Sequence, residues 1–219
     1  MNTHAFSFHG AALVALPSGA LFWPEERLLV VSDLHLGKSA RLSAVGGAQL
    51  PPYEGRDTLQ RLERDIEATG ARRVICLGDS FDAPEIESAL PEEERLWITR
   101  LQAGRDWTWI EGNHDPGPVA LGGAHREAVV LGPLTFRHVA GETPGEVSGH
   151  YHPKARLALR GRSLSRPCFL VDATRLILPA FGSYTGGLCC SRAPLAGLMG
   201  DGAQAILTGA RVVAIPMPR

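Results

Sequence analysis

Short apolar runs alternate with segments of helical periodicity in the first half of the chain. Three runs have the length of buried strands, and polar residues follow each at once: Arg27–Val31, Arg73–Leu77 and Trp107–Ile110. Leu59, Leu62 and Ile66 recur at helical spacing before Gly70, which is a typical helix stop. The three glutamates after Pro91 are typical of the first turn of another helix. The first half is therefore predicted to consist of β-α units.

The helical signal fades after Val129, and short strands separated by turns are predicted instead. They are Leu134–Arg137, Arg156–Leu159, Phe169–Val171, Leu176–Leu178 and Val212–Ile215. The chain has 219 residues, 44% of them hydrophobic, and no Pro/Gly/Ser-rich linker divides it. Residues 1–219 are therefore expected to form a single domain.

No apolar stretch approaches the ~20 residues of a membrane span, so no membrane association is expected. The four cysteines show no C-x-x-C spacing, which argues against a disulfide scaffold or a zinc knuckle. A cytoplasmic location suits them. Cys189 and Cys190 are most simply two packing residues, and the sequence gives them no further role.

Charge is divided unevenly along the chain. Residues 1–115 carry 18 acidic and 11 basic side chains, whereas residues 116–219 carry 5 acidic and 11 basic ones. An acidic half that binds cations and a basic half that meets an anionic substrate would explain this division, and so would unrelated solvated faces.

Clusters of metal-binding side chains follow the early strands and recur later in the chain. They are Asp33-x-His35, Gly78-Asp79-Ser80-Phe81-Asp82, Gly112-Asn113-His114-Asp115, His138 and Gly149-His150-Tyr151-His152. Ligands of α/β proteins lie beyond the carboxyl ends of strands, so these clusters can converge on one site. Mixed imidazole, carboxylate and amide donors suit Mn, Fe, Zn or Co better than Mg or Ca. Two such ions about 3.5 to 4 Å apart activate water and clamp a phosphorus centre, which predicts phosphoester hydrolysis.

The order of these five clusters resembles that of the calcineurin-like metallophosphoesterases, whose pattern is D-x-H, G-D-x-x-D, G-N-H-[DE], H and G-H-x-H. The resemblance implies an α/β (α+β) fold: a four-layer αββα sandwich of two mixed β-sheets flanked by helices. It also implies two divalent metal ions. A set of turn-forming acids, asparagines and packed histidines is the alternative for any one cluster taken alone.

The resemblance also implies a role for each residue. The first metal would be bound by Asp33, His35, Asp79 and His152, and the second by Asp79, Asn113, His138 and His150. The catalytic His114 would face the leaving-group oxygen as general acid or charge stabiliser. Asp82 or Asp115 would orient the imidazole rings of the ligands without binding a metal itself. Both residues are equally typical of turn or helix caps. The family usually has glycine or a small polar residue after the histidine that matches His138, and here Val139 follows.

Two further segments, Asp33–Lys38 and Leu178–Gly187, are similar to the bacterial ligase-associated DNA damage response endonucleases, the PdeM group. This resemblance implies a Mn²⁺-dependent phosphodiesterase acting on DNA in repair, with Fe or Zn as other metals. It further implies association with an ATP-dependent DNA ligase, a helicase and an exonuclease. A hydrolase of a small nucleotide or pyrophosphate-containing substrate is an alternative, and a metal-fold scaffold in a repair assembly is a non-enzyme alternative.

A basic stretch follows the last predicted ligand and has only Asp172 opposing it: Lys154, Arg156, Arg160, Arg162, Arg166 and Arg175. Arg156, Arg160 and Arg162 are candidate contacts to a nucleic-acid backbone. Alternating arginines can equally form the solvated face of a strand.

Overall fold

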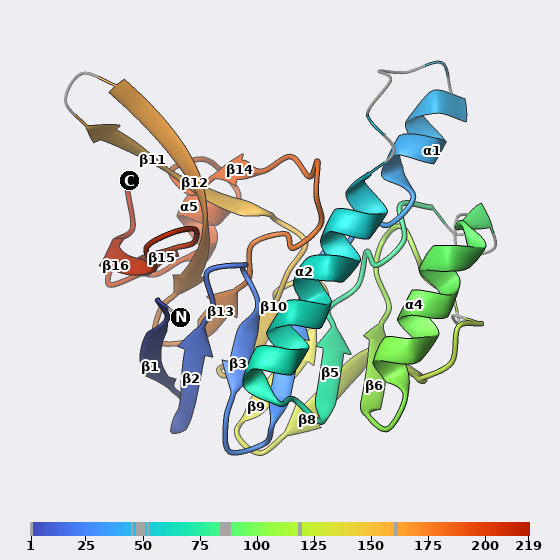
Figure 1. Ribbon diagram of the computed structural model, residues 1–219. Helices are drawn as coiled ribbons and strands as arrows, with labels where there is room; N and C mark the ends of the chain where they lie inside the picture. Colours follow the sequence, from blue (N-terminus) through green and yellow to red (C-terminus); the bar gives the residue numbers. More distant parts are fainter. Residues whose placement is uncertain are drawn as a thin grey trace.

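Two β-sheets pack face to face in the computed structural model, with helices concentrated on the outside of one of them (Figure 1). The structure describes residues 2–44, 46, 51, 53–83, 89–117, 120–159 and 162–219. Each sheet mixes parallel and antiparallel pairs, so the predicted two-sheet α/β sandwich is confirmed.

The first sheet has seven strands in sequence order. They are β1 (His4–Phe8), β2 (Ala11–Ala15), β3 (Leu21–Trp23), β4 (Leu28–Val31), β5 (Arg73–Cys76), β6 (Asp106–Ile110) and β7 (Ala124–Arg126). The pairs from β1 to β4 are antiparallel, and those from β4 to β7 are parallel. The parallel part therefore presents several carboxyl ends at one edge.

The helices α1 (Lys38–Ala44), α2 (Glu54–Thr69) and α4 (Glu92–Gln102) belong to the part of the chain that forms this sheet (Figure 1). Leu59, Leu62 and Ile66 of α2 are buried in one core cluster with strand residues such as Val31 and Trp107. The predicted apolar face of α2 thus covers the sheet, and Gly70 ends the helix in the left-handed conformation.

The second sheet has nine strands. They are β8 (Ala128–Leu131), β9 (Leu134–Arg137), β10 (Glu146–Ser148), β11 (Pro153–Leu159), β12 (Arg162–Val171), β13 (Arg175–Ile177), β14 (Leu188–Cys189), β15 (Gln204–Leu207) and β16 (Val213–Pro216). The pairs β9–β10 and β10–β13 are parallel. The β11–β12 pair is antiparallel, and its far end projects beyond the rest of the sheet in Figure 1.

An apolar layer joins the two sheets. It combines Phe8 and Ile75 of the first sheet with Phe136, Phe169 and Ile206 of the second, all at most 5% exposed. A separate cluster on the outer face of the second sheet includes Leu195 of the short helix α5 (Leu195–Leu198). Among the described residues, α5 is the helix of this outer layer, so the fourth layer is thinner than the others.

The apolar runs predicted as strands all lie in strands, within a few residues at the ends. Trp107 and Trp109 are buried in the sheet core as expected. The sequence did not indicate β1–β3, β7, β8, β10, β14, β15, α1 or α5. Within the described part of the chain, no helix combines the length and apolarity required to cross a membrane.

Candidate metal centre

The predicted ligands lie just beyond the carboxyl ends of parallel strands from both sheets. In the first sheet Asp33 follows β4, Asp79 follows β5 and Asn113 follows β6. In the second sheet His138 follows β9 and His150 follows β10. The structure brings all seven predicted ligands to one place, where the two sheets meet.

One group of side chains consists of Asp33, His35 and His152, whose donor atoms lie within 4.8 Å of one another. Nε2 of His152 is 3.2 Å from Oδ1 of Asp33 and 3.4 Å from Nε2 of His35. Asp33 is fully buried, and both its oxygens also face the backbone N–H of His150.

A second group consists of Asp79, His138 and His150, again within 4.8 Å. Nε2 of His138 is 3.4 Å from Oδ2 of Asp79, 3.0 Å from Oδ1 of Asn113 and 3.2 Å from Nδ1 of His150. The same Oδ2 of Asp79 lies 4.0 Å from Nε2 of His35 in the first group. Asp79 is therefore placed between the two groups.

The donor atoms of these groups fit cations, because their lone pairs face one another. Nδ1 of His138 is 2.7 Å from the carbonyl oxygen of Leu77, which can only accept, so Nδ1 carries a proton. Nε2 of the same ring then faces the oxygens of Asp79 and Asn113, which a proton on Nε2 or a bound cation would satisfy. Nδ1 of His35 likewise faces Oδ1 of Asp82 at 2.9 Å. Each cluster of acceptors requires a proton or a metal ion at its centre.

Unusual backbone conformations orient these side chains toward the centre. Five of the seven predicted ligands are non-glycine residues with positive φ: Asp33 (52°), His35 (45°), Asp79 (48°), His150 (68°) and His152 (46°). Such conformations cost energy and cluster at functional sites when the surroundings hold them in place. Here the N–H of His35 donates to the carbonyl of Asp79 at 2.9 Å, and that of Asp33 to Gly78 at 3.2 Å.

The glycines of the motifs are required because neighbouring ligand loops come too close to leave room for a side chain. A Cβ on Gly112 would stand 2.1 Å from the backbone nitrogen of Asp79, and one on Gly149 would stand 2.6 Å from Oδ2 of Asp33. Any larger residue would push the ligand loops apart.

Asp82 and Asp115 support the centre in different ways. Asp82 bonds the His35 imidazole, as expected for a carboxylate that fixes a ligand's tautomer. Asp115 differs: it accepts from the backbone N–H groups of Asp79, Ser80 and Phe81 at 2.9, 2.7 and 3.3 Å. Its contacts are those of a turn cap, the alternative left open by the sequence, and it orients the loop that carries Asp79.

His114 is exposed at the edge of the centre. Its ring meets that of His35 edge to face, with centroids 5.2 Å apart, and its Nδ1 donates to the carbonyl of Asp82 at 3.0 Å. Its backbone N–H donates to Oδ1 of Asp79 at 2.9 Å. His114 also groups with His35 and Asp82, but there Asp82 is already bonded to the basic side chain of Arg41.

The electrostatics of the buried acids differ. Burial raises the pKa of Asp79, but the hydrogen bond and charge of His138 outweigh burial and bring the pKa below its usual range. Burial, assisted by the negative charge of Asp79, raises the pKa of Asp115 to about 6. Burial followed by the charge of His138 lowers the pKa of His150.

Sequence reasoning missed two supports of the centre. Arg41 of α1 bonds Asp82, and the ammonium of Lys38 lies 3.8 Å from it. The segment Ala180–Gly182 lies against the Asp33 loop, because the N–H of Phe181 donates to the carbonyl of Ser32 at 2.7 Å. The Lys38 and Leu178–Gly187 motifs were visible in the sequence, but nothing in it showed that they touch the ligand loops.

The candidate backbone contacts are only partly described. Arg156 is exposed on β11. Arg160 lies outside the described residues, and the side chain of Arg162 is not among those described, although its backbone pairs with Leu159. Arg166 and Arg175 instead donate to the carbonyls of Thr208 and Gly141, which indicates structural roles.

This fold and this arrangement of side chains match a known family. The model of the calcineurin-like phosphoesterases matches residues 26–163, and the chain belongs to this family. It is a metal-dependent phosphoesterase, since the family uses divalent metals and the ligand clusters are present. A similar solved structure is the crystal structure of Pseudomonas putida nuclease MPE, with a TM-score of 0.74 and 31% identity, covering 98% of this chain and 100% of that one. No curated protein sequence matches significantly.

Proposed function

We propose that this phosphoesterase cleaves phosphodiester bonds in nucleic acid, and DNA in particular. The observation that carries the proposal is the position of Oδ2 of Asp79 between the two donor groups, 4.0 Å from Nε2 of His35 and 3.4 Å from Nε2 of His138. A shared carboxylate of this kind suits a two-metal centre for in-line displacement at phosphorus. The similarity to a nuclease supports nucleic acid as the substrate.

In this proposal Asp33, His35, Asp79 and His152 hold one divalent ion, and Asp79, Asn113, His138 and His150 hold the other. When bound, the two ions lower the pKa of water and withdraw charge from the phosphoryl oxygens. His114 donates its Nδ1–H to the carbonyl of Asp82, so Nε2 is the nitrogen left to face the leaving-group oxygen as general acid. Asp82 holds the His35 ring, and Asp115 holds the loop of Asp79.

Mn²⁺ is the proposed metal, with Fe and Zn as alternatives, because both sets mix imidazole and carboxylate donors and Asn113 adds an amide oxygen to the second. Reconstitution of chelator-treated protein with each metal, followed by measurement of bound metal and of turnover, tests this choice. The highest turnover with Zn²⁺ or Fe²⁺ would reject Mn²⁺.

The assay that tests the function uses purified protein with Mn²⁺ on bis-p-nitrophenyl phosphate, its monoester counterpart, nucleotides, plasmid and single-stranded DNA. We expect hydrolysis of the diester and nicking of the plasmid. Asp79→Asn, purified identically, shows whether a contaminating nuclease is responsible. Hydrolysis of nucleotides or small diesters without DNA cleavage would reject the nuclease and favour the small-substrate hydrolase. Inactivity on every substrate would favour the scaffold.

Repair-related partners and location belong to the same proposal. Association with an ATP-dependent DNA ligase, a helicase and an exonuclease is supported by the sequence resemblance to the PdeM group, and co-purification with the purified partners tests it. A cytoplasmic location is supported by the cysteines, since Cys76, Cys168, Cys189 and Cys190 are all free thiols.

A further inference from the structure

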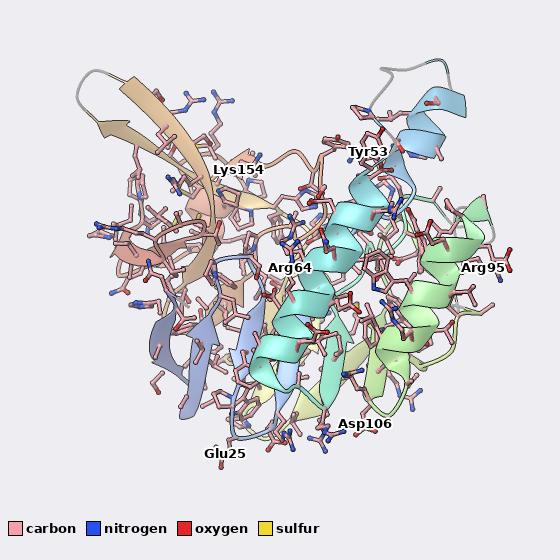
Figure 2. The ribbon with its side chains drawn as sticks, in the orientation of Figure 1. Glu25, Tyr53, Arg64, Arg95, Asp106 and Lys154 are labelled. Carbon is pink, nitrogen blue, oxygen red and sulfur yellow. The ribbon has the colours of Figure 1, made fainter. Side chains whose placement is uncertain are left out.

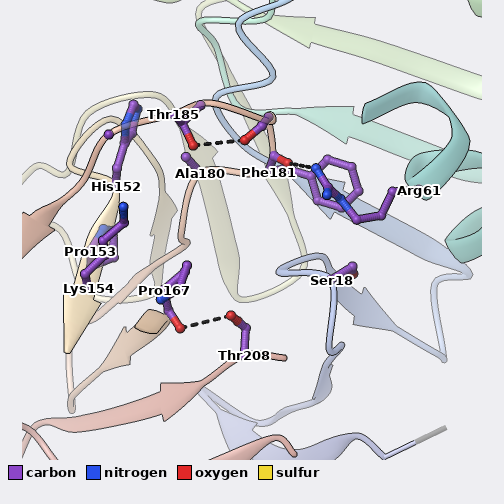
Figure 3. Close-up of a pocket in the computed structure, with 12 residues that line it drawn as sticks. Ser18, Arg61, His152, Pro153, Lys154, Pro167, Ala180, Phe181, Thr185 and Thr208 are labelled. Carbon is purple, nitrogen blue, oxygen red and sulfur yellow. Dashed lines mark hydrogen bonds between the residues drawn. The ribbon is translucent and has the colours of Figure 1, made fainter. Parts of the chain in front are cut away.

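A pocket of about 160 Å³ opens beside His152, and none of the other predicted ligands is among the described residues that line it (Figure 3). Its walls come from β11, β12, α2 and the segment Ala180–Gly186. Lys154 and Arg61 approach it from opposite sides, and Thr185 lies at one end. The pocket thus shares one wall, His152, with the metal centre.

The charge of the pocket is positive. Its charged lining residues are Lys154 and Arg61, and no carboxylate is among the described residues that line it. In the described part of the chain the ammonium of Lys154 has neither a hydrogen-bond nor an ion-pair partner, whereas the other lysine, Lys38, pairs with Asp82. A partly buried ammonium without a partner favours an anion.

Arg61 is held rigidly on the other side. Its guanidinium lies 4.8 Å above the Phe181 ring and donates to the Phe181 carbonyl, and its Nη1 is 3.2 Å from Oδ2 of Asp57. Asp57 is 58% exposed, so solvent screens its effect on the charge of Arg61. Arg61 therefore adds a fixed positive charge to that of Lys154.

The stem of Lys154 is also constrained. A Cβ on Gly187 would stand 2.4 Å from Cε of Lys154 and 2.7 Å from the carbonyl oxygen of His152. The absence of a side chain on Gly187 thus gives Lys154 its place beside His152.

We propose that this pocket binds a second phosphate group of the substrate, next to the phosphodiester that is cleaved, with Lys154 as its principal ligand. The proposal rests on the proposed function, and it makes Lys154 and Arg61 determinants of specificity for substrates with more than one phosphate. The second phosphate can be a neighbouring backbone diester or a terminal monoester. These two sources share the anionic oxygens that an ammonium recognises.

The first experiment compares dithymidine monophosphate (TpT), its forms with a 5′- or 3′-terminal phosphate (pTpT and TpTp), and the trinucleotide TpTpT. With Mn²⁺, kcat/KM is expected to be about tenfold higher for at least one substrate with a second phosphate than for TpT, mainly through KM. A preference for pTpT or TpTp alone identifies a terminal phosphate, and a preference that includes TpTpT identifies the backbone. Equal values for all four substrates would overturn the proposal.

Variants then assign the effect to the pocket. Lys154→Met is expected to abolish the preference, and Lys154→Arg to retain most of it, because the charge remains. Arg95→Met makes the same change of charge on the exposed face of α4, far from Lys154 in Figure 2, and should keep the preference. A Lys154→Met variant that loses activity equally on TpT and on the phosphorylated forms would contradict the proposal.

A binding experiment separates this inference from the function. In EDTA, the affinity of the metal-free protein for labelled single-stranded DNA is followed by fluorescence anisotropy against salt. Lys154→Met should reduce the slope of log K against log salt by about 0.7, the value for one phosphate contact, and Arg95→Met should not. An unchanged slope would overturn the inference even if diesters are hydrolysed. A reduced slope would support it even if they are not.

Discussion

At the scale of single residues, Asp82 connects the candidate metal centre to helix α1. Its carboxylate is 1% exposed and bonds both Nδ1 of His35 and the guanidinium of Arg41. The backbone carbonyl of Asp82 accepts a hydrogen bond from Nδ1 of His114. The orientations of a proposed ligand and of the proposed acid therefore depend on one residue.

The first prediction concerns His114. His114→Ala should lower kcat on bis-p-nitrophenyl phosphate by about 10²- to 10⁴-fold, the usual contribution of a general acid, while leaving metal content intact. Turnover and elemental analysis of the same preparation check both parts. Since His125 also carries an imidazole but lies away from the ligands, His125→Ala serves as control. Loss of metal from His114→Ala would show that its role is misassigned.

A second prediction concerns Glu94, which is 7% exposed at the junction of α4 and α2. Burial, followed by the charges of Glu54 and Glu93, raises the pKa of Glu94. The folded state therefore binds the proton more tightly than the unfolded state. Stability falls as pH rises from the unfolded pKa through the folded one, and the cost is fully present above the folded pKa.

Glu94→Gln should consequently raise the Tm at pH 7, and the gain should shrink as the pH falls toward 4, the range of the unfolded carboxyl. Thermal unfolding followed by circular dichroism at several pH values measures it. Glu92→Gln is the matched control, because Glu92 is exposed in the same turn of α4 and is not among the charges that raise the pKa of Glu94. If the Tm changes equally in both variants, the burial of the Glu94 carboxylate is not the cause of the change.

The order of the clusters along the chain predicted that their side chains would meet, because most of them follow strand ends, and the structure brings these side chains within reach of one another. They were not enough to separate the roles of Asp82 and Asp115. An aspartate suits a turn cap and an imidazole partner equally well, and only the fold decides which donors reach it. Arg41 and Arg61 were missed because their partners lie 41 and 120 residues away.

At the scale of elements, the loop after β13 is fixed against the loop after β4. A Cβ on Gly182 would stand 2.0 Å from the carbonyl oxygen of Leu34, whereas nothing lies within 4 Å of one on Gly186. There is therefore room for a side chain at Gly186 but not at Gly182, although both glycines belong to the same loop.

The third prediction follows from this difference. Gly182→Ala should destabilise the protein by about 1–3 kcal/mol, because backbone must move to admit the methyl group. Gly186→Ala should be neutral or slightly stabilising, since it restricts only the unfolded chain. Urea unfolding of both variants tests this. If the two variants unfold at the same urea concentration, the close approach at Gly182 does not affect the stability of the protein.

Elements with continuous apolar runs, such as β4 and β5, were predictable from sequence because both faces of each strand are buried. Strand β8 was missed although Ala128–Leu131 is also a short apolar run, and in the structure its residues alternate between exposed and half-buried positions. Strands β14 and β7, with two and three residues, depend on neighbours far away in sequence for their hydrogen bonds.

At the scale of the whole molecule, we propose that residues 1–219 unfold as one domain. The layer between the sheets combines Phe8 and Leu13 near the start of the chain with Ile206 and Val212 near its end. Neither sheet can bury its inner face without the other.

The fourth prediction uses this coupling. Saturating Mn²⁺ at about 100 times its Kd should stabilise the folded state by about 2.7 kcal/mol for each ion bound, which corresponds to a Tm increase of about 5–10 °C per ion that EDTA reverses. Differential scanning calorimetry should show a single transition. Asp79→Asn should lose most of the increase. Two separate transitions, with only one sensitive to metal, would argue against one domain.

Each donor group takes members from both sheets, with Asp33 and His35 joined by His152 in one, and Asp79 joined by His138 and His150 in the other. A polypeptide still being synthesised thus carries an incomplete complement of donors until residue 152 has emerged and the second sheet has docked. A phosphoesterase built in this way would lack both complete donor groups, and with them its activity, for that whole interval on the ribosome.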